Sequence, residues 1–407
     1  MPSVSSNPAR NWTRLDGVDL LRGLAILFVL MNHVNMRLLQ GKVDYTRGLP
    51  DQLVSSLVWN GQFGVQIFFA VSGFLITSTT IRRWGSLSHI NIRDFYLLRF
   101  ARIAPLFFLL AGILSIFHLA GVKHFVISRQ DGGLGGALLA VFTFSVNWLE
   151  ARRGYLPGAW DILWSLSVEE MFYLFFPPIC RLLRPGKLLI AFLLVLVVLG
   201  PFARTTLAHG NEVWREYSYL SGMDAIALGC LTALAVSRFR FSRLMVRFIG
   251  GLGLAILVFI LAFSLRVTAW GITKHGLDMT ILAVGTCMII ACASQTRWRS
   301  PWFLRPVVGL GQRSYEIYLT HMFVVFSFFE LFVASGKSVA AVPALFVLVI
   351  LASAVLGDLV ARFYSEPINS SLRKAWGDGV NRLGSAVAGT AAGEKKSSTH
   401  PPPSALE

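Results

Sequence analysis

Three titratable side chains, Asp19, Arg22 and His33, interrupt the apolar segment "DLLRGLAILFVLMNHVN" at residues 19–35. Arg22 and His33 are eleven positions apart, so on an α-helix they lie within roughly 20° of the same face, about 16 Å apart along the axis. A histidine this deep in an apolar segment is costly unless it faces a protein-lined cavity. Because imidazole exchanges protons near neutral pH, His33 is a candidate general base or nucleophile.

For the other polar residues near the start of this segment, purely structural roles are an equally good explanation. Asp16 suits the N-cap of a helix, and Asp19 suits the first turn, where the helix dipole favours acids. Arg22 can extend its guanidinium toward lipid headgroups. His33 lies too deep for that, so the functional interpretation is strongest for the histidine.

Two arginines stand three positions apart in "RDFYLLRFARIAP", at Arg99 and Arg102. That spacing places both guanidinium groups on one face of a helix, where they suit bidentate binding of a phosphate or carboxylate. A cluster of basic residues that only fixes membrane orientation explains them as well.

Acidic groups occur in two later apolar segments. "WDILWSLSVEEMFYLFFPP" carries Glu169 and Glu170, with Tyr173 one turn after Glu169. Adjacent residues point about 100° apart on a helix, so we expect only one of the two acids to face a shared centre. "GQRSYEIYLTHMFVVF" carries Glu316 and His321. A histidine there also suits a hydrogen bond between helices, without any catalytic role.

The composition indicates what must position these groups. Over 407 residues the chain is 55% hydrophobic and 14% charged, with a mean hydropathy of +0.62. These values predict an all-α, polytopic membrane bundle. Apolar runs of about 20 residues can be drawn at 20–40, 61–81, 103–121, 132–149, 160–182, 187–201, 218–237, 248–264, 276–294, 315–334 and 342–362.

The distribution of lysine and arginine predicts the topology, because these residues are retained on the cytoplasmic side of short loops. Basic and less basic loops alternate, with both termini cytoplasmic, only if residues 132–182 cross the membrane once. We therefore expect about ten transmembrane helices, with part of 150–175 lying in the interface or folding back into a cavity. The net charge of +16 then reflects orientation and contact with anionic lipid, and a nucleic acid partner is not expected.

The sequence divides into three parts. Residues 1–14 are expected to form a cytoplasmic N-terminal segment, 15–370 the membrane domain, and the polar, Pro-rich residues 371–407 a disordered cytoplasmic tail. The four cysteines lie within or at the end of apolar stretches and lack the spacing of metal ligands, so neither a metal site nor a disulfide framework is expected. They are Cys180, Cys230, Cys287 and Cys292.

The order of these blocks resembles the acyltransferase-3 family of integral-membrane acyltransferases. Arg22 and His33 match the family's signature of an arginine, ten residues and a histidine. "FGVQIFFAVSGFLIT", with Ser72 and Gly73, is similar to the family's second span. Further similar blocks follow in the family's order over roughly residues 15–370: Arg99 with Arg102, "WSLSVEEMFYLFFP", "DAIALGCL", "SYEIYLTH" and "FYSEP".

The resemblance implies an enzyme that moves an acyl group, commonly acetyl from acetyl-CoA, onto a hydroxyl of a carbohydrate or another cell-envelope acceptor. It implies a multi-pass protein of the bacterial inner membrane, with acyl-CoA as a co-substrate and no tightly bound cofactor. His33 inherits the catalytic role. Arg22 would steady the thioester or the developing negative charge, and Asp19 or a glutamate would orient the histidine.

Roles for the remaining residues follow from the same resemblance. Arg99 and Arg102 would hold the phosphates of coenzyme A, although the family's arginine-rich block is thinned here by Phe100 and Ala101. Glu169 or Glu170 would complete the polar centre, and Ser72, Tyr173 and His321 are candidate substrate-binding residues.

The residues alone, without the resemblance, suit an ion- or proton-coupled transporter nearly as well, because intramembrane Arg, Asp, Glu and His groups also mark transport pathways. Paired Gly- or Pro-interrupted spans in corresponding halves, which would indicate an inverted repeat, are not visible. The identity of the acceptor and the oligomeric state stay open.

Overall fold

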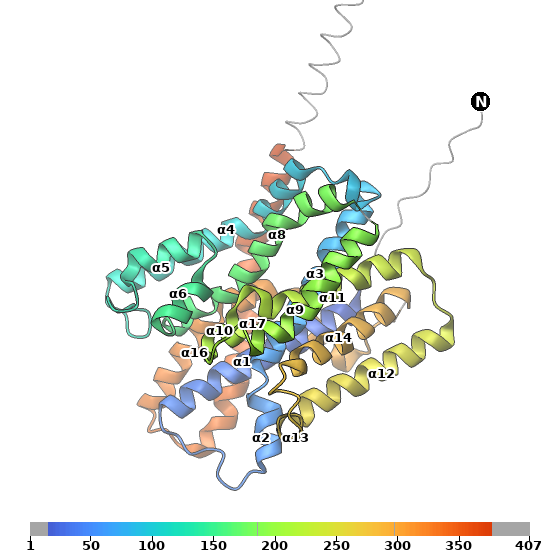
Figure 1. The fold of residues 1–407 in the computed structure, drawn as a ribbon. Coiled ribbons are helices and arrows are strands. Elements are labelled where there is room, and N and C mark those ends of the chain that lie inside the picture. The colour runs from blue at the N-terminus through green and yellow to red at the C-terminus, as the bar shows by residue number, and fades with distance from the viewer. Residues whose placement is uncertain (1–14, 185, 297, 377–407) are drawn as a thin grey trace, which may run out of the picture.

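In the computed structural model the described residues are 15–184, 186–296 and 298–376, and their regular structure is helical throughout (Figure 1). The long helices are α1 Asp16–Gln40, α3 Gly61–Trp84, α4 Ile92–Leu119, α8 Leu163–Leu183, α9 Lys187–Thr205, α11 Tyr219–Arg238, α12 Arg243–Ala262, α14 Leu277–Gln295, α16 Ser314–Ala334 and α17 Val342–Val360. The short helices are α2 Asp51–Val58, α5 Gly133–Phe142, α6 Val146–Arg153, α7 Gly158–Asp161, α10 Glu212–Tyr217, α13 Ser264–Ala269 and α15 Arg305–Gln312. Single turns lie at Leu87–His89, Trp302–Leu304, Val339–Ala341 and Ala361–Ser365.

Nine helical segments of this described region are long and apolar enough to cross a bilayer, and they contain every long helix except α8. Helix α8 has 21 residues, enough for a crossing, but carries Glu169 and Glu170 near its middle. The backbone of such helices satisfies its own hydrogen bonds, as an apolar medium requires. The expected multi-pass helical membrane fold is confirmed.

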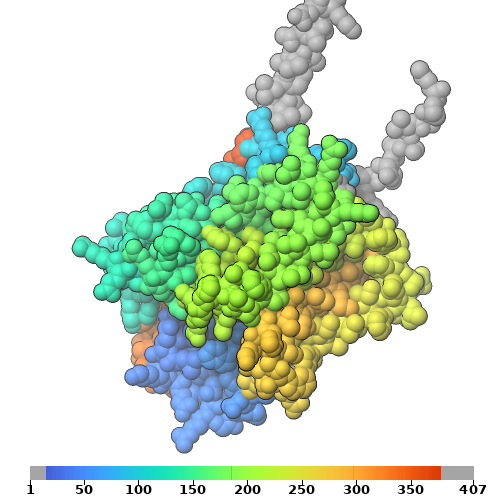
Figure 2. Space-filling view, viewed as in Figure 1, coloured from blue at the N-terminus to red at the C-terminus, as the bar shows by residue number. Residues whose placement is uncertain are grey.

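The segment 132–182 contains one long helix. Helix α5 has 10 residues and α6 has 8, so they extend about 15 Å and 12 Å, too short to span a bilayer. Part of 150–175 was expected to lie outside the span, and residues 150–162, which hold the end of α6, a loop and α7, do precede the long helix that begins at Leu163. Helices α5 and α6 project from one side of the bundle and form a lobe in the space-filling view (Figures 1 and 2).

The described structure ends beyond the predicted domain boundary. Helix continues from the turn at Ala361–Ser365 to Trp376, so residues 371–376 are helical although the sequence places them in the tail. The expectations for residues 1–14 and 377–407 lie outside the described residues.

Helices α1, α4 and α16 run in one direction, because contacts advance together along them: His33 and Arg37 of α1 lie against His321 and Phe326 of α16, and Ile103 and Phe117 of α4 lie against Tyr315 and Phe323. Helix α8 runs back, because Ser165 near its start contacts Tyr318 of α16, whereas Leu174, further along, contacts Tyr96 near the start of α4. We call the two ends of the bundle the Asp16 end and the Gln40 end, after the ends of α1.

Helices α3 and α11 pack backbone against backbone through small residues. A Cβ added to Gly73 of α3 would lie 1.9 Å from the carbonyl oxygen of Ile226, and one added to Gly229 of α11 would lie 2.1 Å from that of Ala70. Apolar lipid gives helices no hydrophobic reason to associate, so close backbone packing supplies much of the attraction. The glycine after Ser72 is therefore required by this crossing.

A buried ion pair ties the same helices to their neighbours. Arg204 of α9 donates through Nη2 to Asp224 Oδ2 of α11 at 2.7 Å and through Nε to the carbonyl oxygen of Gly276 at 2.9 Å. Gln66 of α3 donates to Asp224 Oδ1 at 2.9 Å, and Thr280 of α14 donates to Oδ2 at 2.6 Å. Asp224, the first residue of the "DAIALGCL" block, thus holds four helices together.

Replacing Gly73 by alanine should lower the free energy of unfolding by about 1–3 kcal/mol, because the added methyl group meets backbone that cannot move aside easily. Thermal unfolding of the detergent-purified protein measures the loss. Gly112→Ala in α4 is the matched control, since a Cβ there meets nothing within 4 Å. Equal melting temperatures for the two variants would contradict the close packing of α3 on α11.

Candidate active site

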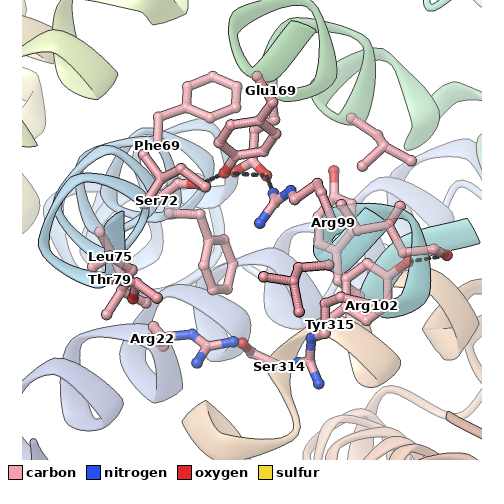
Figure 3. A pocket seen from close by; sticks show the side chains of 18 of the residues that line it. Arg22, Phe69, Ser72, Leu75, Thr79, Arg99, Arg102, Glu169, Ser314 and Tyr315 are labelled. Carbon is pink, nitrogen blue, oxygen red and sulfur yellow. Dashed lines mark hydrogen bonds and ion pairs between the residues drawn. The ribbon is translucent and has the colours of Figure 1, made fainter. Parts of the chain in front are cut away.

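A cavity of about 350 Å³ lies among α1, α3, α4, α8 and α16 toward the Asp16 end of the bundle. Its size is that of a small-molecule site. Figure 3 shows Arg99 beside Glu169 and Ser72, with Arg22 and Ser314 on the opposite side of the cavity. Its polar lining consists of Arg22, Ser72, Thr79, Thr80, Arg83, Arg99, Arg102, Ser165, Glu169, Tyr173, Ser314, Tyr315, Tyr318 and Arg373.

Arg99 is held between two carboxylates. Its Nη2 lies 3.6 Å from Glu170 Oε1 and 3.9 Å from Glu169 Oε2, and its guanidinium carbon lies 3.5 Å from the centre of the Tyr173 ring. Both neighbouring acids thus reach the same arginine, but only Glu169 also lines the cavity. The sequence expectation that one of the two acids faces the centre agrees with this geometry.

Ser72 and Tyr173 lie together on the cavity wall. Their hydroxyl groups contact each other, and the Tyr173 hydroxyl also donates to Glu169 Oε2 at 3.5 Å. The contacts join α3 to α8 along this wall (Figure 3). Two of the three candidate substrate-binding residues, Ser72 and Tyr173, therefore line the cavity, whereas His321 does not.

Asp19 and Arg22 do not stand where the resemblance implied. Asp19 Oδ1 lies 3.7 Å from Arg22 Nη1 within the same helix. His33 follows Asp19 by fourteen residues, about 21 Å along the axis, so Asp19 is too far away to orient it. Arg22 lies about 16 Å from His33, so it cannot stabilise charge that develops beside the histidine. We therefore correct both assignments.

Several arginines line the cavity near the Asp16 end. Arg83 is in the last turn of α3, and Arg373 lies in the helix that continues from α17. Arg102 Nη1 lies 3.9 Å from Glu316 Oε1, the acid of the "SYEIYLTH" block. The charges of Arg83 and Arg102 both act on Arg373. This concentration of positive charge, larger than the sequence pair alone indicated, suits a polyanionic group.

His33 lies beside His321, with ring centroids 5.0 Å apart. His321 is fully buried, and its Nδ1 lies 2.7 Å from the carbonyl oxygen of Tyr318. A carbonyl accepts only, so Nδ1 carries the proton and Nε2 of the neutral ring is an acceptor. Within the described structure that Nε2 has no hydrogen-bond partner. The structure thus pairs two histidines that are 288 positions apart in the sequence.

The histidine pair lies beyond the inner end of the cavity. Ser165 and Tyr318 line the cavity, and their hydroxyl groups are 2.7 Å apart. The Tyr318 and His321 rings are then 5.8 Å apart by centroid. Tyr318 and Ser165 therefore stand between the arginine-lined cavity and His33.

Three charged residues next to this pair were missed by the sequence reasoning. Arg37 is one turn after His33 on α1, Asp161 directly precedes α8, and Glu150 is in α6. Burial raises the pKa of Glu150 well above its usual range and that of Asp161 to about 7. The signal that could have revealed Asp161 is its place four residues before Ser165, itself four before Glu169.

Comparison with known proteins agrees with the order of the polar blocks. A family model described as an acyltransferase domain, that of the acyltransferase-3 family, matches residues 15–358. The matched region contains Asp19, Arg22 and His33 of α1 and also His321 of α16. No solved structure matches this chain.

Curated relatives carry related names. O-acetyltransferase OatA of Staphylococcus aureus is 25% identical over 382 residues, an alignment that covers 89% of this chain and 58% of that protein. A putative O-acetyltransferase of Staphylococcus aureus strain COL is similar to the same extent. The chain thus spans somewhat more than half the length of the curated relatives it matches.

Replacing Arg99 by alanine should lower the free energy of unfolding by about 3–5 kcal/mol, because Glu169 and Glu170 lose their shared counter-charge. Thermal unfolding in detergent measures it, and Arg93→Ala, an exposed arginine of the same helix, is the control, expected within about 0.5 kcal/mol of wild type. Adding Glu170→Gln to Arg99→Ala should recover part of the loss. An Arg99→Ala variant as stable as the control would contradict the ion-pair role.

Proposed function

Because the chain belongs to the acyltransferase-3 family, we propose that it is a membrane O-acyltransferase that moves an acetyl group from acetyl-CoA to a hydroxyl group of a cell-envelope carbohydrate. The observation that carries the proposal is the alignment of an arginine-lined cavity with a histidine pair at its inner end. The names of the O-acetyltransferase relatives support acetyl as the group transferred.

The cavity suits the donor's chemistry. Arg83, Arg102 and Arg373 would bind the phosphates of coenzyme A, since guanidinium groups pair with phosphate oxygens through two parallel hydrogen bonds. Arg99 is already held by two carboxylates, so it positions α8 and the Tyr173 ring rather than the phosphates. The uncharged arm of the donor would extend past Ser72 and Tyr173 toward Ser165 and Tyr318.

The transfer step follows from the His33 position. The acceptor oxygen forms a bond to the thioester carbonyl carbon as the carbon–sulfur bond breaks, and the hydroxyl proton passes to His33. The leaving thiolate then receives that proton, which restores the histidine and yields the ester and free coenzyme A.

His321 orients His33 in this mechanism. Its Nδ1 is fixed by the Tyr318 carbonyl, and its Nε2, which has no hydrogen-bond partner in the described residues, would accept from an N–H of His33 in the substrate complex. The other nitrogen of His33 is then the basic one. In this proposal the neutral imidazole of His321 orients His33, a role that the sequence analysis gave to Asp19 or a glutamate.

The proposed orientation places the Asp16 end, where the donor enters, at the cytoplasmic face of a bacterial cell membrane. Acetyl-CoA is a cytoplasmic metabolite, and the arginines at this end agree with the tendency of basic residues to stay on that side. With ten crossings, both ends of the described chain lie on the donor side.

In membrane vesicles, wild-type protein should incorporate label from radiolabelled acetyl-CoA, and His33→Ala should reduce the incorporation by at least about 100-fold, because the transfer loses its general base. Exposed His89 supplies the control, His89→Ala, which should transfer at the wild-type rate. Incorporation should require donor at the cytoplasmic face, so sealed inverted vesicles should be active and right-side-out vesicles inactive. A His33→Ala variant that still transfers label would refute the mechanism.

Arg83→Ala and Arg102→Ala should each raise the apparent KM for acetyl-CoA about tenfold and leave the acceptor KM unchanged, because each removes a charge-assisted hydrogen bond to phosphate. Steady-state kinetics in detergent measure both constants. Arg82→Ala, which changes an exposed arginine adjacent to Arg83, should leave the donor KM at the wild-type value. An effect on the acceptor KM instead would move these arginines to the other substrate.

A further inference from the structure

A pair of carboxyl groups lies at the Gln40 end, outside the arginine-lined cavity. Glu150 of α6 is fully buried, and its Oε1 accepts a hydrogen bond from the Leu156 amide at 3.1 Å. Its side chain is in hydrogen-bonding contact with Asp161. Carboxylates in contact cannot both be ionised, so the pair holds one proton and one negative charge.

Polar atoms around this pair lack partners. Glu150 Oε2 and Asp161 Oδ1 are buried with no partner in the described part of the chain beyond the proton that the two carboxyl groups share, and Arg37 Nε is buried with no partner there at all. Asn32 Oδ1, one position before His33, is in the same condition. Buried polar atoms without partners cost about 1–3 kcal/mol each, so their concentration beside the catalytic histidine points to a ligand that supplies the missing hydrogen bonds.

The group is adjacent to His33 but separated from the donor cavity. Arg37 is one turn after His33, and its charge acts on both His33 and Asp161. A Cβ added to Gly158 of α7 would lie 3.5 Å from Arg37 Nη2 and 2.8 Å from the side chain of Met322, the neighbour of His321. Asp161 is the last residue of α7, and Ser165, which lines the cavity, lies four residues later near the start of α8, so Asp161 lies beyond Ser165 on the side of the Gln40 end.

The chemistry of the group selects its ligand. A singly charged acid pair repels phosphate, which excludes the coenzyme A phosphates, and its polarity excludes an acyl chain. Hydroxyl groups donate to carboxylate oxygens and accept from the Arg37 guanidinium. A molecule with several hydroxyls can therefore supply hydrogen bonds both to the acceptor oxygens and to the donor nitrogen of this group. The exposed Tyr155 ring packs edge-on against Tyr217 at 5.8 Å, and Tyr217 in turn stacks on the buried Trp164 at 4.0 Å. The exposed face of Tyr155 suits the C–H surface of a sugar ring.

We propose that Glu150, Asp161 and Arg37 bind the carbohydrate acceptor, on the opposite side of the His33–His321 pair from the donor. This assignment rests on the proposed acetyl transfer and extends it: donor and acceptor enter from opposite ends of the bundle and meet at His33. His33, Arg37 and Asp161 each keep part of their surface accessible, as a site open to a second substrate requires.

The test is the double variant Glu150→Gln/Asp161→Asn, which keeps the size of both side chains and a hydrogen bond between them but removes the charge. The acceptor is base-deacetylated envelope polysaccharide, used as a dilution series with radiolabelled acetyl-CoA. The acceptor's apparent KM should rise about tenfold or more, while the KM for acetyl-CoA stays unchanged. Arg37→Gln, which alters a different helix, should show the same split between the two constants.

The matched control is Glu330→Gln, which neutralises a partly exposed acid of α16 paired with Lys123 and His124. It should leave both constants at wild-type values. Thermal stabilisation by coenzyme A, equal in wild type and variants, establishes that the variants are folded and bind the donor.

Three results would overturn the assignment: unchanged acceptor KM in both variants, a raised KM for acetyl-CoA, or label that enters lipid or small amines instead of polysaccharide. The first two results leave acetyl transfer to polysaccharide by the wild type intact, so only the acceptor site fails. The third also removes carbohydrate as the acceptor in the proposed function, although acetyl transfer itself stands. If wild-type protein neither transfers label in a His33-dependent manner nor is stabilised by coenzyme A, the proposed function fails and the acceptor site fails with it.

Discussion

The site depends on Arg99, held between Glu169 and Glu170. A bilayer supplies no water to charged groups, so an arginine on a membrane-spanning helix persists only where the protein itself supplies the counter-charge. Two carboxylates on α8 do this, and the contact fixes α8 against α4 with the Tyr173 ring stacked on the guanidinium. Because Tyr173 also contacts Ser72 of α3, this ionic interaction joins three of the five helices around the cavity.

From that point a line of polar groups runs along the bundle. Arginines surround the cavity at the Asp16 end, the Ser165 and Tyr318 hydroxyls stand at its inner end, and the two histidines follow. Glu150, Asp161 and Arg37 complete the line toward the Gln40 end. Transport proteins also use such lines, but here the family, the arginine-lined cavity and the paired histidines favour chemistry between two substrates.

The polar residues on one face of α1 lie at two separate places in the structure. Its arginine and histidine share a face but are about 16 Å apart, too far to act on one reacting atom. Arg22 lines the cavity, whereas His33 lies beyond its inner end, where we propose that the transfer occurs. His33 packs against His321 of α16, whose tautomer is fixed by its hydrogen bond to the Tyr318 carbonyl oxygen of the same helix.

The sequence by itself determined the helical membrane fold, because long apolar runs permit little else, and it identified the polar residues that a bilayer makes expensive. Helical periodicity also placed Arg99 with Arg102, and Ser72, Glu169, Tyr173 and both arginines do meet in one cavity. Which groups touch was decided by tertiary structure. Periodicity relates residues within one helix, whereas His33 with His321 and Glu150 with Asp161 are set by how helices pack. The short α5 and α6 likewise depend on packing, since their apolar composition alone resembled a span.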